Sequence, residues 1–169
     1  RYTVTDPRRV AEQFELDAIE ADLSRPRYNI APTQDVPAVL ARDGQRVLID
    51  LSWGLVPSWA KDRTIGARLI NARAETLASK PSFRSAFARR RCLVVADGFY
   101  EWQRSGGAKQ PVYIRVDDGA PFAFAGLYDR WRPDTPDALI SCTIVTTEPN
   151  RLLKPIHNRM PAILPRDAY

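Results

Sequence analysis

Glycine-containing turns between short apolar runs are the feature that most restricts the fold of this chain. Asp43-Gly44, Gly106-Gly107 and Asp118-Gly119 each separate two such runs and are strong hairpin signals. The runs predict strands over 36–42, 46–53, 93–102, 111–116, 122–131 and 139–147. Because these strands follow one another without alternating helices, the pattern favours an α+β domain built on a curled antiparallel sheet or barrel.

Two short helices are expected beside the strands. Pro7 suits the first position of a helix that would bury Val10 and Phe14. A second helix is expected over 82–87, where two phenylalanines four residues apart would form a packing stripe. The 169 residues contain no repeat and no linker, so they fit a single domain.

One carboxylate stands out in the predicted strand over 93–102, LVVADGFYEW. Glu101 lies between Tyr100 and Trp102 in a segment otherwise suited to a core. Burial disfavours the charged form and would raise the pKa of this carboxyl, which suits a general acid or base near neutral pH. The alternative is a glutamate on the solvent face of the strand, paired with one of the many arginines.

Charge and cysteine content narrow the function classes. The net charge is +5, and 21 of the 25 basic residues are arginine. Arginine binds phosphate through two hydrogen bonds, so nucleic acid is a candidate partner, although a GC-rich genome would also favour arginine. Cys92 and Cys142 lie in or beside apolar runs, which fits buried thiols in a reducing cytosol. The sequence has no CxxC motif, no second histidine and no paired spacing of metal ligands, so we expect no metal site. We also expect no cofactor.

Two further polar residues lie in apolar or tightly turned stretches. Asn71 follows Leu69-Ile70, and His157 is the single histidine of the chain. A lone histidine is more often structural than catalytic, but its pKa lies close to neutrality. The residues alone therefore suggest an Asn71–Glu101–His157 site on a basic α+β domain, and they do not specify the reaction.

Five segments together carry a resemblance to a known family. They are RYNIAPTQ (27–34), WGLVPSWAKD (53–62), INARAET (70–76), ADGFYEW (96–102) and IHNRMPAIL (156–164). In this order they resemble the SOS response-associated peptidase (SRAP) family. The resemblance implies an α+β domain on an irregular, mostly antiparallel β-barrel with a few short flanking helices. It also implies a positively charged groove for single-stranded DNA.

The resemblance further implies a covalent reaction with abasic sites in single-stranded DNA. The family's nucleophile is a cysteine at position 2, which is exposed when the protein autocatalytically removes its initiator methionine. The family begins Met-Cys-Gly-Arg, and Arg1 matches that arginine. Residues 1–169 are therefore expected to be one domain lacking Met-Cys-Gly at its start, and possibly a C-terminal segment. Without the cysteine, the chain would be a non-covalent DNA-binding module. A thiol autopeptidase acting only on itself is another alternative.

Matching motifs assign the remaining roles. The resemblance makes Glu101, His157 and Asn71 the catalytic residues. It makes Arg1, Arg73 and Arg159 phosphate ligands, and Trp53 and Trp59 candidates for stacking on bases; for one tryptophan, plain barrel core is at least as good an interpretation. The expected partner is abasic single-stranded DNA, with no membrane and no metal. A cytoplasmic monomer that joins the nucleoid when engaged on DNA is expected.

Overall fold

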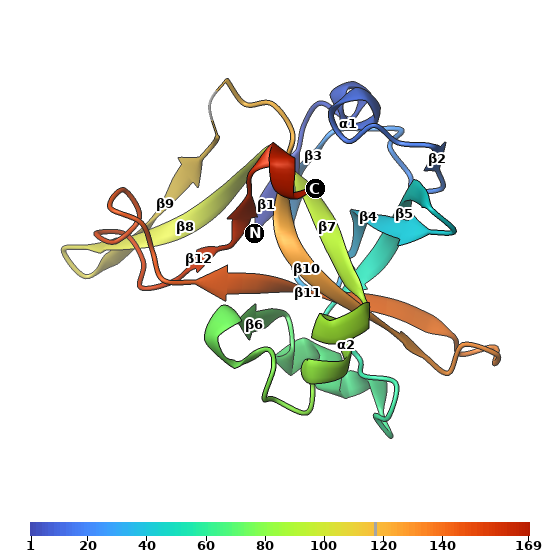
Figure 1. The fold of residues 1–169 in the computed structure, drawn as a ribbon. Helices are drawn as coiled ribbons and strands as arrows, with labels where there is room; N and C mark the ends of the chain where they lie inside the picture. The colour runs from blue at the N-terminus through green and yellow to red at the C-terminus, as the bar shows by residue number, and fades with distance from the viewer. Residues whose placement is uncertain (117) are drawn as a thin grey trace.

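Five strands close into a barrel in the computed structural model, which describes residues 1–116 and 118–169 (Figure 1). The ring runs β11–β10–β7–β4–β5 and returns to β11. The β5–β11 pairing is parallel and the other four are antiparallel. The barrel strands are β4 (Asp35–Arg42), β5 (Gln45–Trp53), β7 (Arg91–Ala96), β10 (Phe122–Trp131) and β11 (Leu139–Thr147). The predicted irregular, mostly antiparallel barrel is confirmed.

The barrel interior is filled by aliphatic and aromatic side chains. Val36, Leu48, Leu51, Val94 and Phe124 are almost fully buried. Their strands carry the β-branched and aromatic residues that pack well on a pleated surface. The Asp43-Gly44 turn joins β4 to β5 as predicted, with both residues at positive φ.

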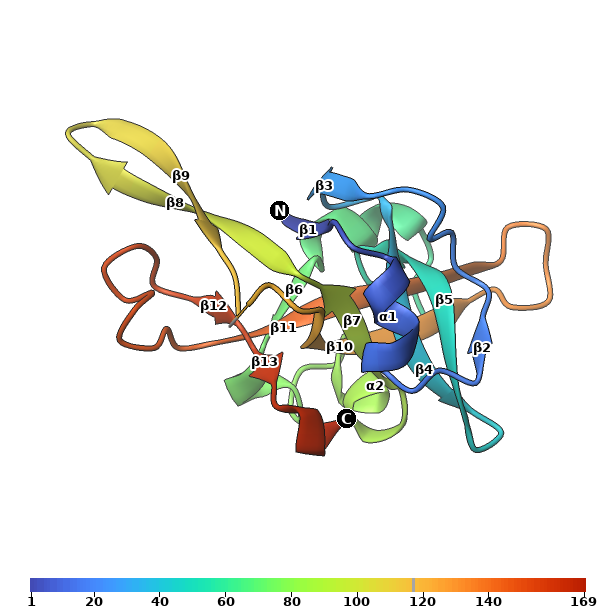
Figure 2. The ribbon, with the colours of Figure 1, turned by 90° about the horizontal axis from the view of Figure 1, so that it is seen from above.

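A second sheet, in the order β3–β1–β8–β9, lies against the barrel. Its strands are β1 (Tyr2–Val4), β3 (Arg27–Ile30), β8 (Gly98–Ser105) and β9 (Ala108–Ile114). Figure 2 shows the β8–β9 hairpin extending away from the barrel. The prediction of one strand over 93–102 is therefore wrong. The chain breaks at Asp97 and passes from the barrel into this sheet, because Asp97 turns its carboxylate toward β1.

Short elements surround the barrel. They are α1 (Arg8–Gln13), α2 (Arg84–Arg89), β2 (Ala18–Ile19), β6 (Asn71–Arg73), β12 (Met160–Pro161), β13 (Ile163–Leu164) and 3₁₀ helices over Arg63–Arg68, Ala74–Thr76 and Arg166–Ala168. Phe83, directly before α2, is buried, but Phe87 within α2 is 40% exposed. Of the two phenylalanines predicted to form a packing stripe, only Phe83 is in the core. No helix in the described residues is long and apolar enough to cross a membrane.

The end of β11 gathers two of the short strands. β6 pairs with it in parallel, with Asn71 opposite Ile144. β12 pairs with it antiparallel, with Pro161 opposite Thr146. Segments more than 80 residues apart in the sequence thus meet at one edge of the barrel.

The segment between β5 and β6 is held by close backbone contact. Gly54 has φ of +144°, and a Cβ on Gly66 would stand 2.6 Å from the Gly54 carbonyl oxygen. Ser58 N–H donates to Asp129 at 3.0 Å, and the Trp131 indole N–H donates to the Ala60 carbonyl at 2.7 Å. These contacts fix the loop that carries Trp59.

Gly66→Ala should destabilise the domain by about 1–3 kcal/mol, because the new methyl group forces two backbone segments apart. Urea unfolding followed by tryptophan fluorescence would measure the change in free energy of unfolding. Gly44→Asn is the matched control, since a Cβ at Gly44 meets nothing within 4 Å and asparagine tolerates positive φ. Equal stability of Gly66→Ala and the wild type would contradict the close-contact interpretation.

Candidate functional site

A cavity of about 150 Å³ opens where β1, β6, β8 and the turn before β12 meet. Its lining includes Asn71, Glu101 and His157, the three residues predicted to react. Three of the predicted DNA ligands, Arg1, Trp53 and Arg159, line it as well. The N-terminus lies close to β8 and β12 (Figures 1 and 2). The fold therefore brings together residues that are distant in the sequence.

Glu101 lies on β8 and is partly buried. Burial raises the pKa of its carboxyl above the ordinary value, while the nearby His157 acts in the opposite direction. The Trp102 backbone N–H also favours the charged form. A carboxyl with a raised pKa can exchange a proton near neutral pH.

The β1–β8 pairing sets where the chain enters the cavity. Tyr2 stands opposite Phe99, and the Tyr100 N–H donates to the Arg1 carbonyl at 2.9 Å. Continued by one residue before Arg1, this register would come opposite Glu101.

Asn71 is held at the cavity by its neighbour in the chain. The Ile70 carbonyl accepts the Trp53 indole N–H at 2.8 Å and the Ile144 N–H at 3.1 Å. Among the described residues, no hydrogen bond engages the exposed Asn71 amide side chain. It can therefore both donate to and accept from a ligand.

His157 is oriented by the backbone two residues on. Its Nδ1 lies 3.1 Å from the Arg159 N–H and 2.9 Å from the Arg159 carbonyl oxygen. If Nδ1 accepts from the N–H, Nε2 carries the proton; if Nδ1 donates to the carbonyl, Nε2 is the acceptor. In both tautomers Nε2 is the nitrogen left for a ligand.

Arg159 is engaged within the protein. Its guanidinium donates to both Glu75 carboxylate oxygens, at 2.8 and 3.0 Å, and to the Thr146 carbonyl at 2.7 Å. This pair lowers the pKa of Glu75 to about 2. A phosphate bound at Arg159 would therefore have to share its guanidinium with Glu75. Arg73, the predicted phosphate ligand in the motif INARAET, is exposed to solvent.

The tryptophans take different places. Trp53 is 5% exposed, and its ring packs 5.5 Å from that of Tyr2. Trp59 is 58% exposed on the loop before β6 and does not line the cavity. Trp102, which the sequence analysis did not single out as a ligand, is 37% exposed beside Glu101. Successive side chains of a strand point to opposite faces of the sheet. If Glu101 faces the cavity, its neighbour Trp102 is therefore expected on the opposite face of β8.

Thr146 was also missed. It lines the cavity, and its carbonyl accepts from Arg159. Its position in the predicted strand 139–147 carried no signal of this role, because the contact depends on β6 and β12 reaching the same strand end.

The cysteines are far from reactive. Cys92 and Cys142 are free and buried, as predicted, and burial raises the pKa of both thiols. A thiol that stays protonated is a poor nucleophile. In the described part of the chain, no group of three His, Cys, Asp or Glu residues could hold a metal ion.

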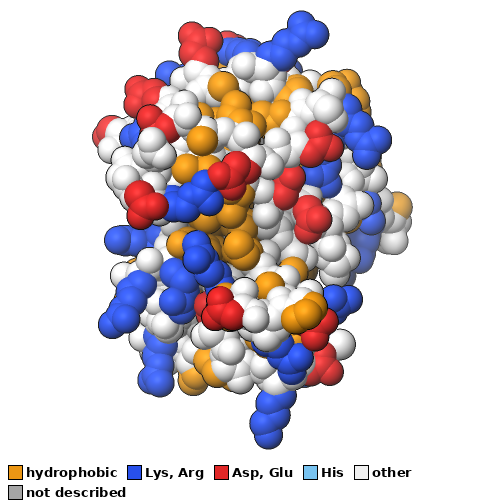
Figure 3. Space-filling model, turned by 90° about the vertical axis from the view of Figure 1, so that its right-hand side faces the viewer, with side chains coloured by type: hydrophobic (Ala, Val, Ile, Leu, Met, Phe, Trp, Pro, Cys, Tyr) orange, Lys and Arg blue, Asp and Glu red, His pale blue; other side chains and the backbone are white. Residues whose placement is uncertain are grey.

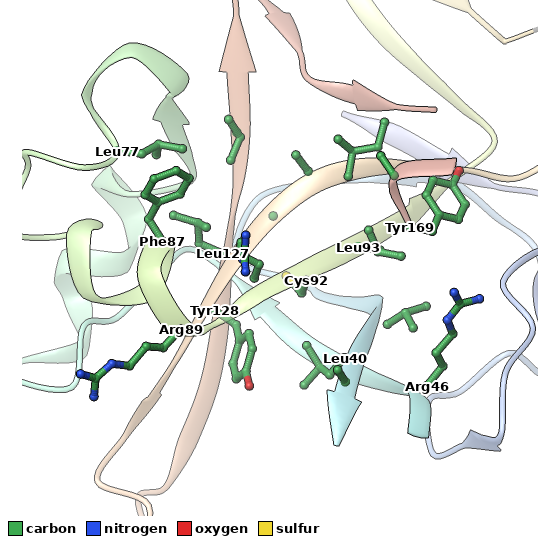
Figure 4. A pocket seen from close by; sticks show the side chains of 18 residues that line it. Leu40, Arg46, Leu77, Phe87, Arg89, Cys92, Leu93, Leu127, Tyr128 and Tyr169 are labelled. Atoms are coloured by element: carbon green, nitrogen blue, oxygen red, sulfur yellow. The ribbon is translucent and has the colours of Figure 1, made fainter. Parts of the chain in front are cut away.

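A larger cavity, of about 720 Å³, contains none of the predicted site residues. It lies over β7 and β10, between α2 and the C-terminal Tyr169, and Figure 4 shows Leu40, Leu93 and Leu127 around it. Figure 3 shows a face of the molecule with hydrophobic side chains in a central hollow. The lining is mainly apolar and holds no acid–base pair, which separates it from the smaller polar cavity.

Comparison with known proteins gives a consistent result. The family model described as SOS response associated peptidase (SRAP) matches residues 1–169. The chain is 45% identical over 160 residues to the abasic site processing protein YoaM of Bacillus subtilis, spanning 94% of this chain and 70% of YoaM. It is 35% identical over 174 residues to the abasic site processing protein HMCES of Gallus gallus, spanning 85% of this chain and 52% of HMCES.

Solved structures share the fold. A protein from Bordetella bronchiseptica superposes with a TM-score of 0.83 at 26% identity, covering 99% of this chain and 84% of its own. A protein from Bacteroides thetaiotaomicron gives a TM-score of 0.75 at 34% identity, covering 88% of this chain and 66% of its own. The barrel with its added strands is therefore a fold already seen in solved proteins.

Glu101→Gln should raise the melting temperature at pH 7–8 and lose that advantage below about pH 4, near the carboxyl pKa of unfolded chains. The folded pKa of Glu101 is raised, so the wild type loses stability as pH rises from the unfolded pKa through the folded one. Glutamine has no such charge to desolvate. Calorimetry across this pH range measures the difference.

Glu12→Gln on exposed α1 is the control, and its melting temperature should follow that of the wild type. A constant difference between Glu101→Gln and wild type at all pH values would show that desolvation of the carboxylate is not the cause.

Proposed function

This chain belongs to the SOS response associated peptidase (SRAP) family, and on that basis we propose that it binds single-stranded DNA and reacts covalently with abasic sites. Several relatives are named abasic site processing proteins. The nucleophile in this proposal is an N-terminal cysteine that stands two residues before Arg1, with a glycine between them.

The observation that carries the proposal is the register of β1 on β8. With Tyr2 opposite Phe99, a chain continued before Arg1 runs alongside Glu101 and into the cavity that His157 lines. Burial raises the pKa of the Glu101 carboxyl, which favours proton exchange near neutral pH. A carboxyl of this kind beside an extended N-terminal segment supports amine chemistry on a carbonyl.

The reaction can be written with its atoms balanced. An unprotonated α-amine, whose ordinary pKa is about 7.7–8.0, adds to the aldehyde carbon of the ring-opened abasic site. The hydroxyl of the carbinolamine so formed leaves as water with a proton supplied by Glu101, the nitrogen returns a proton to the Glu101 carboxylate, and a Schiff base remains. The cysteine sulfur then bonds to the imine carbon while its proton passes to the nitrogen. A thiazolidine ring results, and neither an oxidant nor a reductant is needed.

Two neighbours have supporting roles in this scheme. His157, through Nε2, would protonate or polarise the sugar oxygen and favour the open aldehyde form. Asn71, whose amide is unengaged among the described residues, would hold the N-terminal residue or the adduct. Cys92 and Cys142 cannot replace the N-terminal thiol, because both are buried and internal.

The same carboxyl would serve the peptidase step for which the family is named. Removal of the initiator methionine requires a nucleophile at the peptide carbonyl and a proton for the departing amine. Glu101 is the acid/base nearest the extended β1 register, so we assign it to this self-processing step as well. Dedicated cleavage of other proteins has no support from the 150 Å³ cavity.

DNA binding is expected to rest on arginine and exposed aromatic side chains. The net charge is +5. Arg73 is exposed two residues from Asn71, Trp59 is exposed on the loop between β5 and β6, and Trp102 is exposed on β8. Aromatic rings stack on bases and arginines contact phosphate, which together bind single strands without strong sequence preference. Trp53 is better suited to holding Ile70, since it is buried.

The test uses protein that carries Cys-Gly ahead of Arg1, mixed with single-stranded DNA containing one abasic site. A band that resists denaturation should form, and it should vanish when serine replaces the cysteine. His157→Ala should slow its formation by about 10²–10⁴-fold with DNA affinity unchanged, because proton transfer and not binding is removed.

Gel analysis over time measures the rate, and fluorescence anisotropy on intact DNA measures the affinity. Tight binding without a resistant band would replace the proposal with a non-covalent single-stranded DNA-binding module. Methionine removal without any DNA adduct would leave a self-acting peptidase. An unchanged rate for His157→Ala would remove that residue from the mechanism.

Arg73→Ala should weaken binding to intact single-stranded DNA and reduce the slope of log affinity against log salt by about one, because one phosphate contact releases fewer counterions. Anisotropy titrations at several salt concentrations measure the slope. Arg42→Ala is the matched control, because Arg42, at the end of β4, forms an ion pair with Glu20 within the protein. Equal slopes for the two variants would exclude Arg73 as a phosphate ligand.

A further inference from the structure

The buried carboxylate of Asp97 is not used by the proposed chemistry. Asp97 is 2% exposed and lies between the last residue of β7 and the first of β8. A carboxylate is rarely so buried unless it is fully hydrogen-bonded. Its partners therefore indicate what it does.

All of its side-chain partners belong to the N-terminal segment. The Thr3 hydroxyl donates to Oδ1 at 2.6 Å, and the Thr5 hydroxyl donates to Oδ2 at 2.7 Å. The backbone N–H groups of Thr5 and Asp6 also donate to Oδ2. The Asp97 N–H in turn donates to the Thr3 carbonyl at 3.0 Å. One side chain thus binds β1 and the residues after it through four donors.

Tyr113 completes this arrangement from β9. Its hydroxyl lies 2.9 Å from the Thr3 hydroxyl, and its ring occupies the space that a Cβ on Gly98 would need. Glycine after Asp97 therefore allows the ring to approach. Thr3 is held between Asp97 and Tyr113, and both contacts depend on Thr3 standing opposite Gly98.

We propose that Asp97 is a positioning residue: it locks the register of β1 on β8 and thereby fixes where the N-terminal segment stands relative to Glu101. A slip of one residue between paired strands turns every side chain to the opposite face of the sheet. The register of a short strand is therefore fixed only if specific contacts favour one alignment over the next. β1 has three residues, and its pairing with β8 covers two residue pairs. Such a short ladder needs an added determinant.

The consequence for the reaction rests on the proposed function. A displacement of the N-terminal segment by about 1 Å can reduce a rate by about 10²-fold, because the reacting atoms no longer meet in a reactive geometry. The DNA contacts proposed for Arg73 and Trp59 would not change, because these exposed side chains lie on other segments, and only the contact of Arg1 moves with β1. A positioning role therefore predicts a loss of rate much larger than any loss of affinity.

The experiment compares Asp97→Asn, Thr3→Val and Thr3→Ser in protein carrying the N-terminal cysteine, each at the same interval below its melting temperature. Asp97→Asn and Thr3→Val should slow crosslinking at saturating abasic DNA by roughly tenfold or more, with a much smaller change in affinity for intact DNA. Thr3→Ser keeps the hydroxyl and should restore most of the rate. Val94→Ala is the control, because it destabilises the barrel core without touching the cavity.

Amide hydrogen exchange tests the register without any chemistry. The Tyr100 N–H, which donates to Arg1, should lose protection in Asp97→Asn and Thr3→Val, while amides of the β7–β10 pair keep theirs. Unchanged protection of Tyr100, or slowing no greater than in Val94→Ala, would overturn the proposal. A wild type that never crosslinks would refute the proposed function alone, because exchange at Tyr100 still decides the role of Asp97.

Discussion

The pairing of β1 with β8 is the interaction on which the candidate site depends. The chain leaves the barrel at Asp97, between β7 and β8. The Asp97 carboxylate accepts a hydrogen bond from Thr3 of β1, which pairs with β8. Glu101 gains its burial and its neighbours from the alignment, because the cavity has β8 on one side and the N-terminal residue on the other. The barrel supplies a rigid base, and the small second sheet supplies the geometry for chemistry.

Local patterns predicted much of this arrangement. The Asp43-Gly44 turn, the apolar runs of the barrel strands and the motif residues Asn71, Glu101 and His157 were read from the sequence, and the fold brings those three residues to one cavity. Turn chemistry and strand alternation act over a few residues, so a sequence reports them directly. The SRAP resemblance added the order of the segments, which local patterns do not contain.

What escaped prediction depends on contacts between distant segments. The strand over 93–102 reads as continuous, but it breaks at Asp97, whose carboxylate accepts hydrogen bonds from Thr3, Thr5 and Asp6 far away in the sequence. Trp53 and Trp59 look alike in sequence, yet one is buried by the parallel β5–β11 closure and the other is held outward by a loop. No local pattern encodes which ring is inside, because that depends on which strand closes the barrel.

The engaged state of Arg159 gives a last physical argument. Its guanidinium is shared between Glu75 and the Thr146 carbonyl, and its backbone holds Nδ1 of His157. Because the pair keeps the pKa of Glu75 at about 2, this carboxylate stays ionised throughout the range in which Glu101 exchanges protons. The ion pair between Glu75 and Arg159 therefore persists across neutral pH, while burial raises the pKa of the Glu101 carboxyl in the same cavity toward neutrality. Two carboxylates near one site thus differ in protonation because one is paired with arginine and the other is desolvated.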